Sequence, residues 1–88
     1  MAYRVTNILT TTSGNTYASA AEWIEEHGRC GTQSSLVSSG SITLASPTSV
    51  RVVKVFENEA DHTSLKAEKD AEGITLSYTV SNIVKETI

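Results

Sequence analysis

The stretch His27-Gly-Arg-Cys30 holds two side chains that bind transition metals, with two residues between them. Zinc normally takes three or four protein ligands. The chain offers only one further histidine, His62, and no second cysteine, so we expect no metal site. Cys30 also makes a weak candidate nucleophile. A reactive thiolate needs a helix N-terminus or a neighbouring cation, whereas Cys30 follows a predicted helix C-terminus with only Arg29 beside it.

His62 is the second titratable side chain that could do acid–base chemistry. It falls in the first turn of a predicted helix, beside Glu59 and Asp61. It could serve as a base facing a cleft, but we expect a solvated helix residue next to two carboxylates. The remaining helix carboxylates form two runs that are typical of solvated faces: Glu22, Glu25 and Glu26, and Glu68, Asp70 and Glu72.

Asn7 is the most unusual placement, because it is polar on the apolar side of the first predicted strand. A buried amide needs a hydrogen-bond partner, which could be backbone, water or a ligand. Tyr3 and Tyr78 occupy inward-facing strand positions and could line a cavity. Trp23 could cap the edge of the core, stack on a ligand or anchor a subunit contact. The candidate ligand-binding residues are therefore Asn7, Tyr3, Trp23, His62 and Tyr78.

Composition excludes several classes of function. The 88 residues are expected to form one domain, 1–88, with 39% hydrophobic residues and a net charge of −3. No basic stripe favours nucleic acid, and no segment approaches the ~20 apolar residues of a membrane span. The N-terminus lacks the pattern of a secretory leader, and one cysteine cannot form an internal disulfide. We expect a cytoplasmic protein without a cofactor, a nucleic-acid partner or a membrane anchor.

The first half of the chain predicts a strand, a helix and a turn between them. The strand covers residues 2–10, and residues 11–15 have turn composition. The helix should run from Tyr17 to His27, with Thr16 as N-cap. Ser19 with Glu22 matches a capping box, which would start it three residues later. Gly28 ends it. Its apolar stripe follows helical spacing: Tyr17, Ala20, Ala21 and Ile24.

The second half predicts two strands, a helix and a final strand. Residues 36–45 form either one bent strand, which we prefer, with Gly40 marking a bulge, or a short hairpin. Residues 50–56 are a β-branched strand with apolar groups on both faces. A helix capped by Asn58 should run to Gly73 and lie close to the sheet through small residues: Ala60, Ser64, Ala67 and Ala71. Strict alternation over 74–81 predicts a half-buried strand with four inward residues: Ile74, Leu76, Tyr78 and Val80.

The order βαββαβ resembles the ferredoxin-like fold, an α+β fold with a four-stranded antiparallel sheet and two helices on one face. More narrowly, the chain is similar to the dimeric α/β-barrel superfamily, which includes cofactorless monooxygenases and stress-responsive proteins. The similarity rests on Tyr3–Leu9 leading to a turn and helix, and on Val50–Phe56 running into Glu57-Asn58-Glu59-Ala60.

This resemblance implies a homodimer with its sheets face to face and ligand pockets between sheet and helices. Haem-degrading members carry an asparagine on the first strand, which Asn7 matches, but their tryptophan and histidine lie elsewhere than Trp23 and His62. The resemblance therefore does not extend to haem.

Three functions fit these expectations. The first is a homodimeric, non-enzymatic binding or accessory protein for a small apolar ligand or a protein partner. The second is a cofactorless monooxygenase-like enzyme for a small apolar or aromatic substrate, with a pocket lined by Asn7, Tyr3, Tyr78 and His62. It requires Asn7 or His62 to point into an enclosed apolar cavity. The third is a monomeric adaptor that uses an exposed sheet face or edge.

Overall fold

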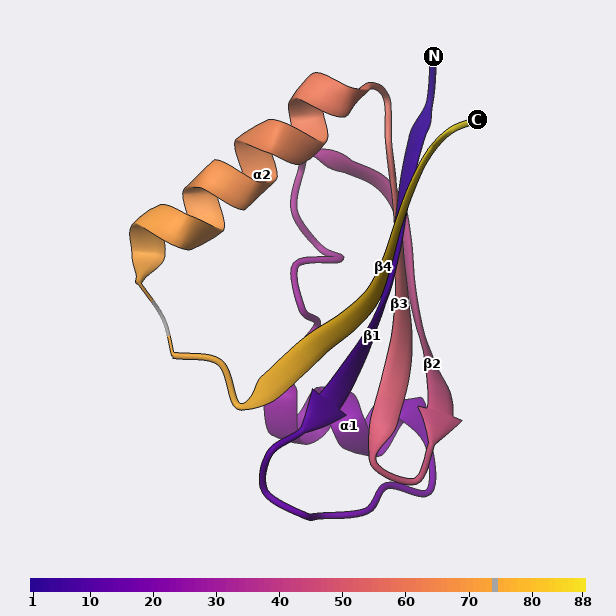
Figure 1. Cartoon of the computed structure of the whole chain (residues 1–88), viewed down its shortest axis with the longest axis vertical. Coiled ribbons are helices and arrows are strands. Elements are labelled where there is room, and N and C mark those ends of the chain that lie inside the picture. Colours follow the sequence, from indigo (N-terminus) through magenta and orange to yellow (C-terminus); the bar gives the residue numbers. More distant parts are fainter. Residues whose placement is uncertain (74) are drawn as a thin grey trace.

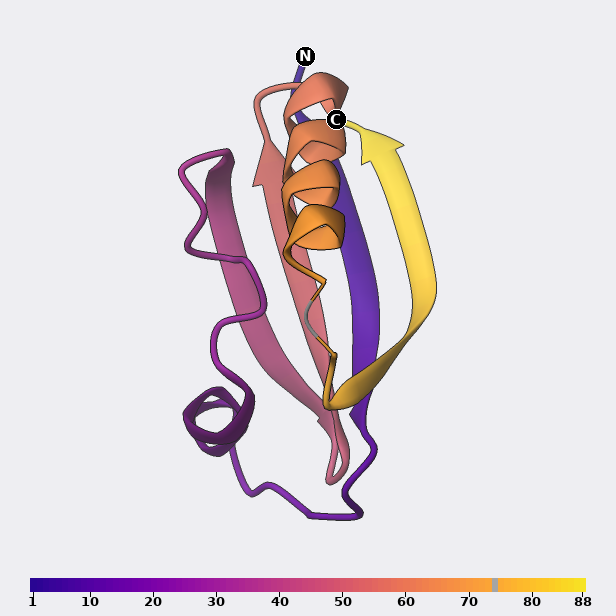
Figure 2. The ribbon, with the colours of Figure 1, turned by 90° about the vertical axis from the view of Figure 1, so that its left-hand side faces the viewer.

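The computed structural model describes residues 1–73 and 75–88 and contains four strands and two helices (Figure 1). In chain order these are β1 (Tyr3–Thr11), α1 (Ala20–His27), β2 (Val37–Ser46), β3 (Ser49–Phe56), α2 (Glu59–Glu72) and β4 (Tyr78–Thr87). The strands form an antiparallel sheet in the order β2-β3-β1-β4. The helices lie on the same side of it (Figure 2). The predicted ferredoxin-like α+β fold is confirmed.

The two central strands, β1 and β3, carry the core. Alternate side chains of a strand share a face, and Tyr3, Val5 and Leu9 of β1 all point to the helical side and are buried. Their partners on β3 include Phe56 opposite Tyr3 and Val50 opposite Leu9. The core forms two clusters. One lies under α1 and contains Leu9, Tyr17, Trp23, Val50 and Val52; the other lies under α2 and contains Tyr3, Val5, Phe56 and Leu65.

Helix α1 starts at the later of its two predicted positions. Oγ of Ser19 accepts a hydrogen bond from the Glu22 N–H at 3.4 Å, so Ser19 is the N-cap. The alternative start at Tyr17 with a Thr16 cap is wrong, because Tyr17 belongs to the segment before the helix. The buried side of α1 is centred on Trp23, which is fully buried, whereas Ala21 of the predicted stripe is exposed.

Helix α2 has the predicted caps but not the predicted buried face. Asn58 Oδ1 accepts from the Asp61 N–H at 3.0 Å, and Gly73 ends the helix with φ of 64°. Leu65 is its buried residue, and the small residues expected to face the sheet are exposed: Ala60, Ser64, Ala67 and Ala71. The reason is geometric. The first turns of α2 pack against the sheet, and the later turns lean away from it (Figure 1).

Strand β2 is one strand, as preferred in the sequence interpretation, rather than a hairpin. Its register shifts lie near its ends, between Val37 and Ser39 and between Leu44 and Ser46. Gly40 marks neither shift. It pairs regularly with Lys54 of β3 and is instead the point where the loop residue Thr32 approaches the strand.

We predict that Gly40→Ala destabilises the fold by about 1–3 kcal/mol, because the added methyl group would overlap Thr32 and force the loop or the strand to shift. A Cβ at Gly40 would lie 2.8 Å from Cβ of Thr32 and 3.2 Å from its carbonyl oxygen. Urea denaturation measures the effect. Ser39→Ala, at an exposed neighbouring position, is the matched control and should unfold like the parent. Equal midpoints for both variants would contradict the prediction.

Strand β4 begins later and extends further than the alternation predicted. It covers Tyr78–Thr87 instead of 74–81. Of the four predicted inward residues, Ile74 lies outside the described residues, Leu76 and Val80 are exposed, and only Tyr78 is partly buried. The half-buried prediction is wrong because β4 is an edge strand and α2 leans away from it. A bulge opposite Asn7, where Asn82 has φ of 50°, interrupts its pairing with β1.

Candidate functional site

A cavity of about 790 Å³ lies over the middle of the sheet, between the end of α1 and the diverging end of α2. Its floor comes from the three strands β1, β3 and β4. Its walls come from the loop after α1, the last turn of α2 and residues 75–77 before β4. The described residues that line it are Asn7, Leu9, Glu26, His27, Arg29, Cys30, Gly31, Gln33, Ser34, Val52, Lys54, Lys69, Asp70, Glu72, Gly73, Thr75, Leu76, Ser77, Tyr78 and Val80.

Asn7 contributes an unsatisfied polar atom to this floor. Its Oδ1 is buried, and no donor in the described part of the chain reaches it. Its neighbours on the floor, Leu9 and Val52, are apolar and buried. A buried amide oxygen without a partner costs about 1–3 kcal/mol. A ligand that donates a hydrogen bond here would recover that cost.

Lys54 contributes an ammonium group to the same floor. Val52 and Phe56, two residues before and after Lys54, lie on the same side of β3 and are buried. The methylene groups of Lys54 therefore run along an apolar surface. A Cβ placed on Gly31 would lie 3.1 Å from Lys54 Nζ, which locates the ammonium against that loop. No ion pair joins Lys54 to a carboxylate within residues 1–73 and 75–88.

Burial lowers the pKa of Lys54, and the neighbouring charge of Lys69 lowers it further, while Cys30 opposes the shift. This direction is the one expected for a cation that has lost water and gained no anionic partner. The floor therefore offers a partly desolvated positive group to a ligand.

Tyr78 forms one wall of the cavity at the start of β4. Its ring centroid lies 5.9 Å from those of Trp23 and His27. Burial, with a smaller contribution from Cys30, raises the pKa of Tyr78 to about 12. The phenol is therefore neutral near pH 7 and can both donate and accept a hydrogen bond.

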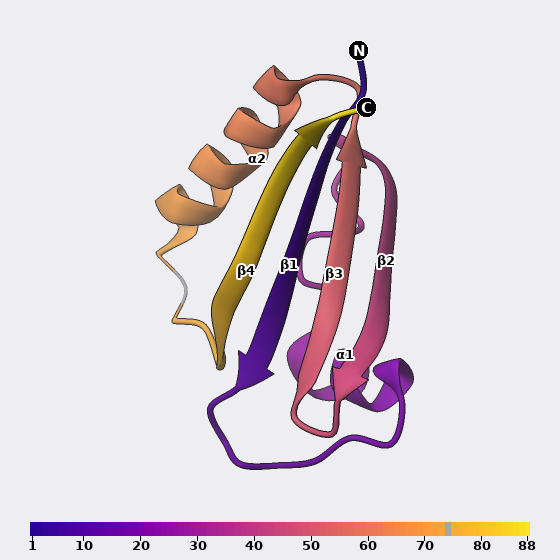
Figure 3. The same cartoon turned by 45° about the vertical axis from the view of Figure 1, so that its right-hand side comes forward.

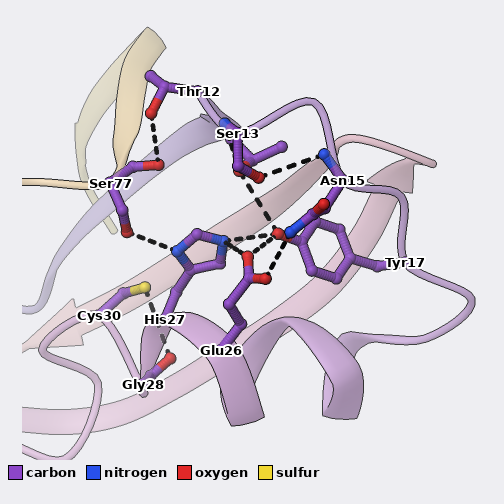
Figure 4. Close-up of polar contacts among 10 residues, drawn as sticks. Thr12, Ser13, Asn15, Tyr17, Glu26, His27, Gly28, Cys30 and Ser77 are labelled. Atoms are coloured by element: carbon purple, nitrogen blue, oxygen red, sulfur yellow. Dashed lines mark hydrogen bonds and ion pairs between the residues drawn. The ribbon is translucent and has the colours of Figure 1, made fainter.

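A cluster of polar contacts surrounds His27 at the end of α1 (Figure 4). His27 Nδ1 lies 2.6 Å from Ser77 Oγ, and Nε2 lies 2.7 Å from Glu26 Oε2 and 2.8 Å from the Tyr17 hydroxyl. The Tyr17 hydroxyl also donates to Glu26 Oε2. The His27 side chain is only 2% exposed, and its ring lies over Trp23 with a centroid separation of 4.1 Å.

The structure brings two of the five predicted ligand residues to the cavity. Asn7 and Tyr78 line it, whereas Tyr3, Trp23 and His62 do not. The His62 ring packs on Tyr3 and Phe56, with centroid separations of 5.7 and 5.3 Å, under the start of α2. Burial lowers the pKa of His62, and the charges of Lys85 and Lys54 act in the same direction.

Three cavity residues were missed in the sequence interpretation. Lys54 carried a detectable signal, since it is the charged residue on the inward side of a strand whose neighbours are Val52 and Phe56. His27 was considered only as a metal ligand. Ser77 falls within the strand predicted over 74–81, but it lies before β4, which begins at Tyr78.

His27 and Cys30, the two potential metal ligands noted in the sequence, both line the cavity. Within the described residues, however, no three His, Cys, Asp or Glu side chains are grouped so that they could hold a metal ion. Cys30 Sγ instead lies 3.7 Å from the carbonyl oxygen of Gly28. None of the described helices has the length and apolar character needed to cross a membrane.

The fold and cavity define a single class of molecule: a small α+β domain of ferredoxin-like topology with a partly polar hollow between sheet and helices. Comparison with protein-family models, with curated proteins and with solved structures found no match to the chain.

Proposed function

We propose that this protein is a homodimer that binds a small molecule with an apolar body and an anionic group in the sheet cavity. The observation that carries the proposal is Lys54, an ammonium group on the cavity floor without a carboxylate partner in the described residues. Known ligand sites combine mostly apolar walls with a few placed polar groups. The strand floor of this cavity combines apolar Leu9, Val52 and Val80 with the polar Asn7 and Lys54, while the walls formed by the loops and the end of α2 are largely polar and charged.

Each part of the ligand has a matching group in the cavity. The apolar body would lie on Leu9, Val52 and Val80. The anionic group would pair with Lys54 and form a charge-assisted hydrogen bond. A hydroxyl or N–H of the ligand would satisfy the buried Asn7 Oδ1. The ligand class is therefore a small amphipathic anion, rather than the purely apolar molecule expected from sequence.

The homodimer part of the proposal is supported by the other face of the sheet, which the helices leave uncovered (Figure 3). At its centre Thr6 of β1 pairs with Val53 of β3 and Val84 of β4. The apolar residues of this open face are Ile8, Val53, Val55 and Val84. An ion pair of 2.8 Å between Arg4 and Glu86 lies beside them. A second copy, turned by a two-fold axis, could match this surface in both apolar area and charge.

The oxygenase alternative receives less support. It required Asn7 or His62 to point into an enclosed apolar cavity. Asn7 lines the cavity, but His62 is outside it and packs on Tyr3 and Phe56. The cavity also carries charged groups, including Lys54 and Glu26. We therefore favour ligand binding over oxygenation.

We predict that Lys54→Met weakens binding of the anionic probe anilinonaphthalene sulfonate by about 10–100-fold. A hydrogen bond to a charged group is worth about 1.5–3 kcal/mol, which corresponds to that range of Kd. Fluorescence titration measures the Kd. Methionine keeps an unbranched apolar stem and removes only the charge.

Two controls separate the effect of the Lys54 charge from a non-specific loss of probe binding. Lys66→Met changes an exposed lysine of α2 that lies outside the cavity lining, and it should bind the probe as tightly as the parent. The neutral probe phenylnaphthylamine lacks the sulfonate, so Lys54→Met should bind it with unchanged affinity. Equal loss in both lysine variants, or equal loss for both probes, would sink the proposal.

A further inference from the structure

His27 is a nearly inaccessible titratable side chain whose two ring nitrogens each have a side-chain partner. Ser77 Oγ lies 2.6 Å from Nδ1, and Glu26 Oε2 lies 2.7 Å from Nε2. The three residues come from the last turn of α1 and from the connection before β4, and all three line the cavity (Figure 4). A hydroxyl, an imidazole and a carboxylate in that order have the connectivity of a nucleophile, a base and an orienting acid.

The proton positions in this cluster follow from Glu26. Hydrogen bonding from Tyr17 is the main cause that lowers the pKa of Glu26, so its carboxylate is ionised near pH 7 and accepts hydrogen bonds only. The Tyr17 hydroxyl gives its single proton to this carboxylate, so its oxygen accepts from the Nε2–H of His27 at 2.8 Å. With one proton on the ring, this leaves Nδ1 as an acceptor. The Ser77 hydroxyl consequently donates to Nδ1. This is the tautomer in which His27 can take a proton from Ser77.

The backbone of Ser77 is held by hydrogen bonds, while its side chain is accessible from the cavity. Its carbonyl oxygen accepts hydrogen bonds from the Thr12 N–H at 3.2 Å and from the Thr12 hydroxyl at 3.0 Å. These two contacts fix its backbone against the end of β1, while the side chain is exposed and lines the cavity. A reactant in the cavity could therefore reach Oγ without any rearrangement of His27.

We propose that Ser77, His27 and Glu26 form a catalytic triad that hydrolyses small carboxylic esters in this cavity. Ser77 Oγ attacks the ester carbonyl carbon, and its proton moves to His27 Nδ1. The bond from carbon to the alcohol oxygen breaks, and His27 returns the proton to the leaving alcohol. Water then attacks the acyl group on Ser77, giving a proton to His27 Nδ1. Collapse of this intermediate releases the carboxylic acid, and the proton restores the Ser77 hydroxyl.

Glu26 is a positioning residue in this scheme, since it accepts the hydrogen bond that orients Tyr17 toward Nε2. Its carboxylate, 2.7 Å from Nε2, also stabilises the charge that His27 gains. The activity goes beyond the proposed ligand binding and does not depend on Lys54. If Lys54 does bind anions, the same cavity would hold the carboxylate product. A positioned general base typically accelerates a reaction by about 10²–10⁴-fold.

The test uses the full chain with p-nitrophenyl butyrate as substrate and a fluorophosphonate as covalent probe. The parent should hydrolyse the ester above the buffer rate and carry the phosphonyl label on Ser77, located by mass spectrometry of peptides. Ser77→Ala should lose at least about 100-fold in kcat/KM, because it removes the nucleophile on which a general-base contribution of about 10²–10⁴-fold acts, and it should lose the label.

Ser81→Ala is the matched control, because Ser81 is an exposed serine of β4 outside the cavity lining. It should keep both the rate and the label. A purely structural cluster that ties α1 to β4 would lower the unfolding midpoint of Ser77→Ala without any label on the parent. An unlabelled parent, a label on another residue, or an unchanged rate in Ser77→Ala would each overturn the proposal, whatever the result with anionic probes.

Discussion

Trp23→Ala is expected to remove about 3–5 kcal/mol of folding free energy, the range measured for large aromatic residues in cores. A domain of 88 residues has a total of roughly 4–13 kcal/mol. Trp23 is fully buried and belongs to the larger core cluster with Leu9 and Val50. Its ring also contacts Tyr17 and His27, with centroid separations of 5.2 and 4.1 Å. Its loss would leave a cavity beneath the His27 cluster.

Trp23→Phe separates the ring from its polar atom. Trp23 Nε1 is buried, and no acceptor in residues 1–73 and 75–88 reaches it, so the parent already bears the desolvation cost of about 1–3 kcal/mol for that group. Phenylalanine removes this group and keeps most of the apolar volume. Its cost should therefore be smaller than that of alanine by about 2 kcal/mol or more.

Urea denaturation followed by far-ultraviolet circular dichroism measures both variants, since the chain has a single tryptophan and its fluorescence is lost in each. Leu76→Ala is the control. Leu76 is a large apolar residue that is 52% exposed, and its truncation should change the free energy of unfolding by less than about 0.5 kcal/mol. If Trp23→Ala and Leu76→Ala unfold at the same urea concentration, Trp23 does not anchor the core. If Trp23→Ala fails to fold, Trp23→Phe supplies the measurement.

The topology was predictable because its signals are local. Alternation marks β1, a run of β-branched residues marks β3, Asn58 caps α2, and glycines end both helices. These signals depend on neighbouring residues in the chain, and the order of elements then limits the fold to few arrangements. The same reasoning identified Asn7 as a polar residue on the inward face.

The buried face of α1 was missed because one of its members is a histidine. Trp23 and His27 are four positions apart and share a helix face, but a histidine does not count as apolar in a hydrophobic pattern. The alanines gave a cleaner stripe, although they offer little area to bury. In α2 the small-residue stripe failed for a similar reason, because Leu65 alone supplies substantial apolar area on that helix.

The cavity could not be predicted because it depends on the angle between α2 and the sheet. That angle is set by how the first turns of α2 pack around Leu65 and by the length of the connection to β4. The pairing of His27 with Ser77 spans 50 residues of sequence, and no spacing rule links positions so far apart. Strand β4 shows the same limit: its alternation indicated a strand, but only the tilt of α2 decides whether it is covered.

Val53→Asp is expected to raise the dissociation constant of the proposed homodimer by at least about 100-fold. Val53 lies near the centre of the open face, between Thr6 of β1 and Ser41 of β2. In a face-to-face dimer its side chain would lose water, and an uncompensated buried charge costs about 3–5 kcal/mol. A two-fold dimer would place two such carboxylates in one interface, so each dimer would bear the cost twice. The conversion of these energies to Kd gives the expected factor.

Sedimentation velocity over a hundredfold range of concentration measures the effect, with circular dichroism to verify folding. Ala67→Asp adds the same charge on the exposed side of α2, away from the open face, and should dimerise like the parent. A monomeric parent at every concentration would exclude the homodimer and direct the search to a different protein partner for this face. A dimeric Val53→Asp protein with unchanged affinity would place the subunit contact elsewhere. The exposed apolar residues Ile83 of β4 and Ile88, which follows it, would be the next positions to change, since an edge strand can pair with a second copy of itself.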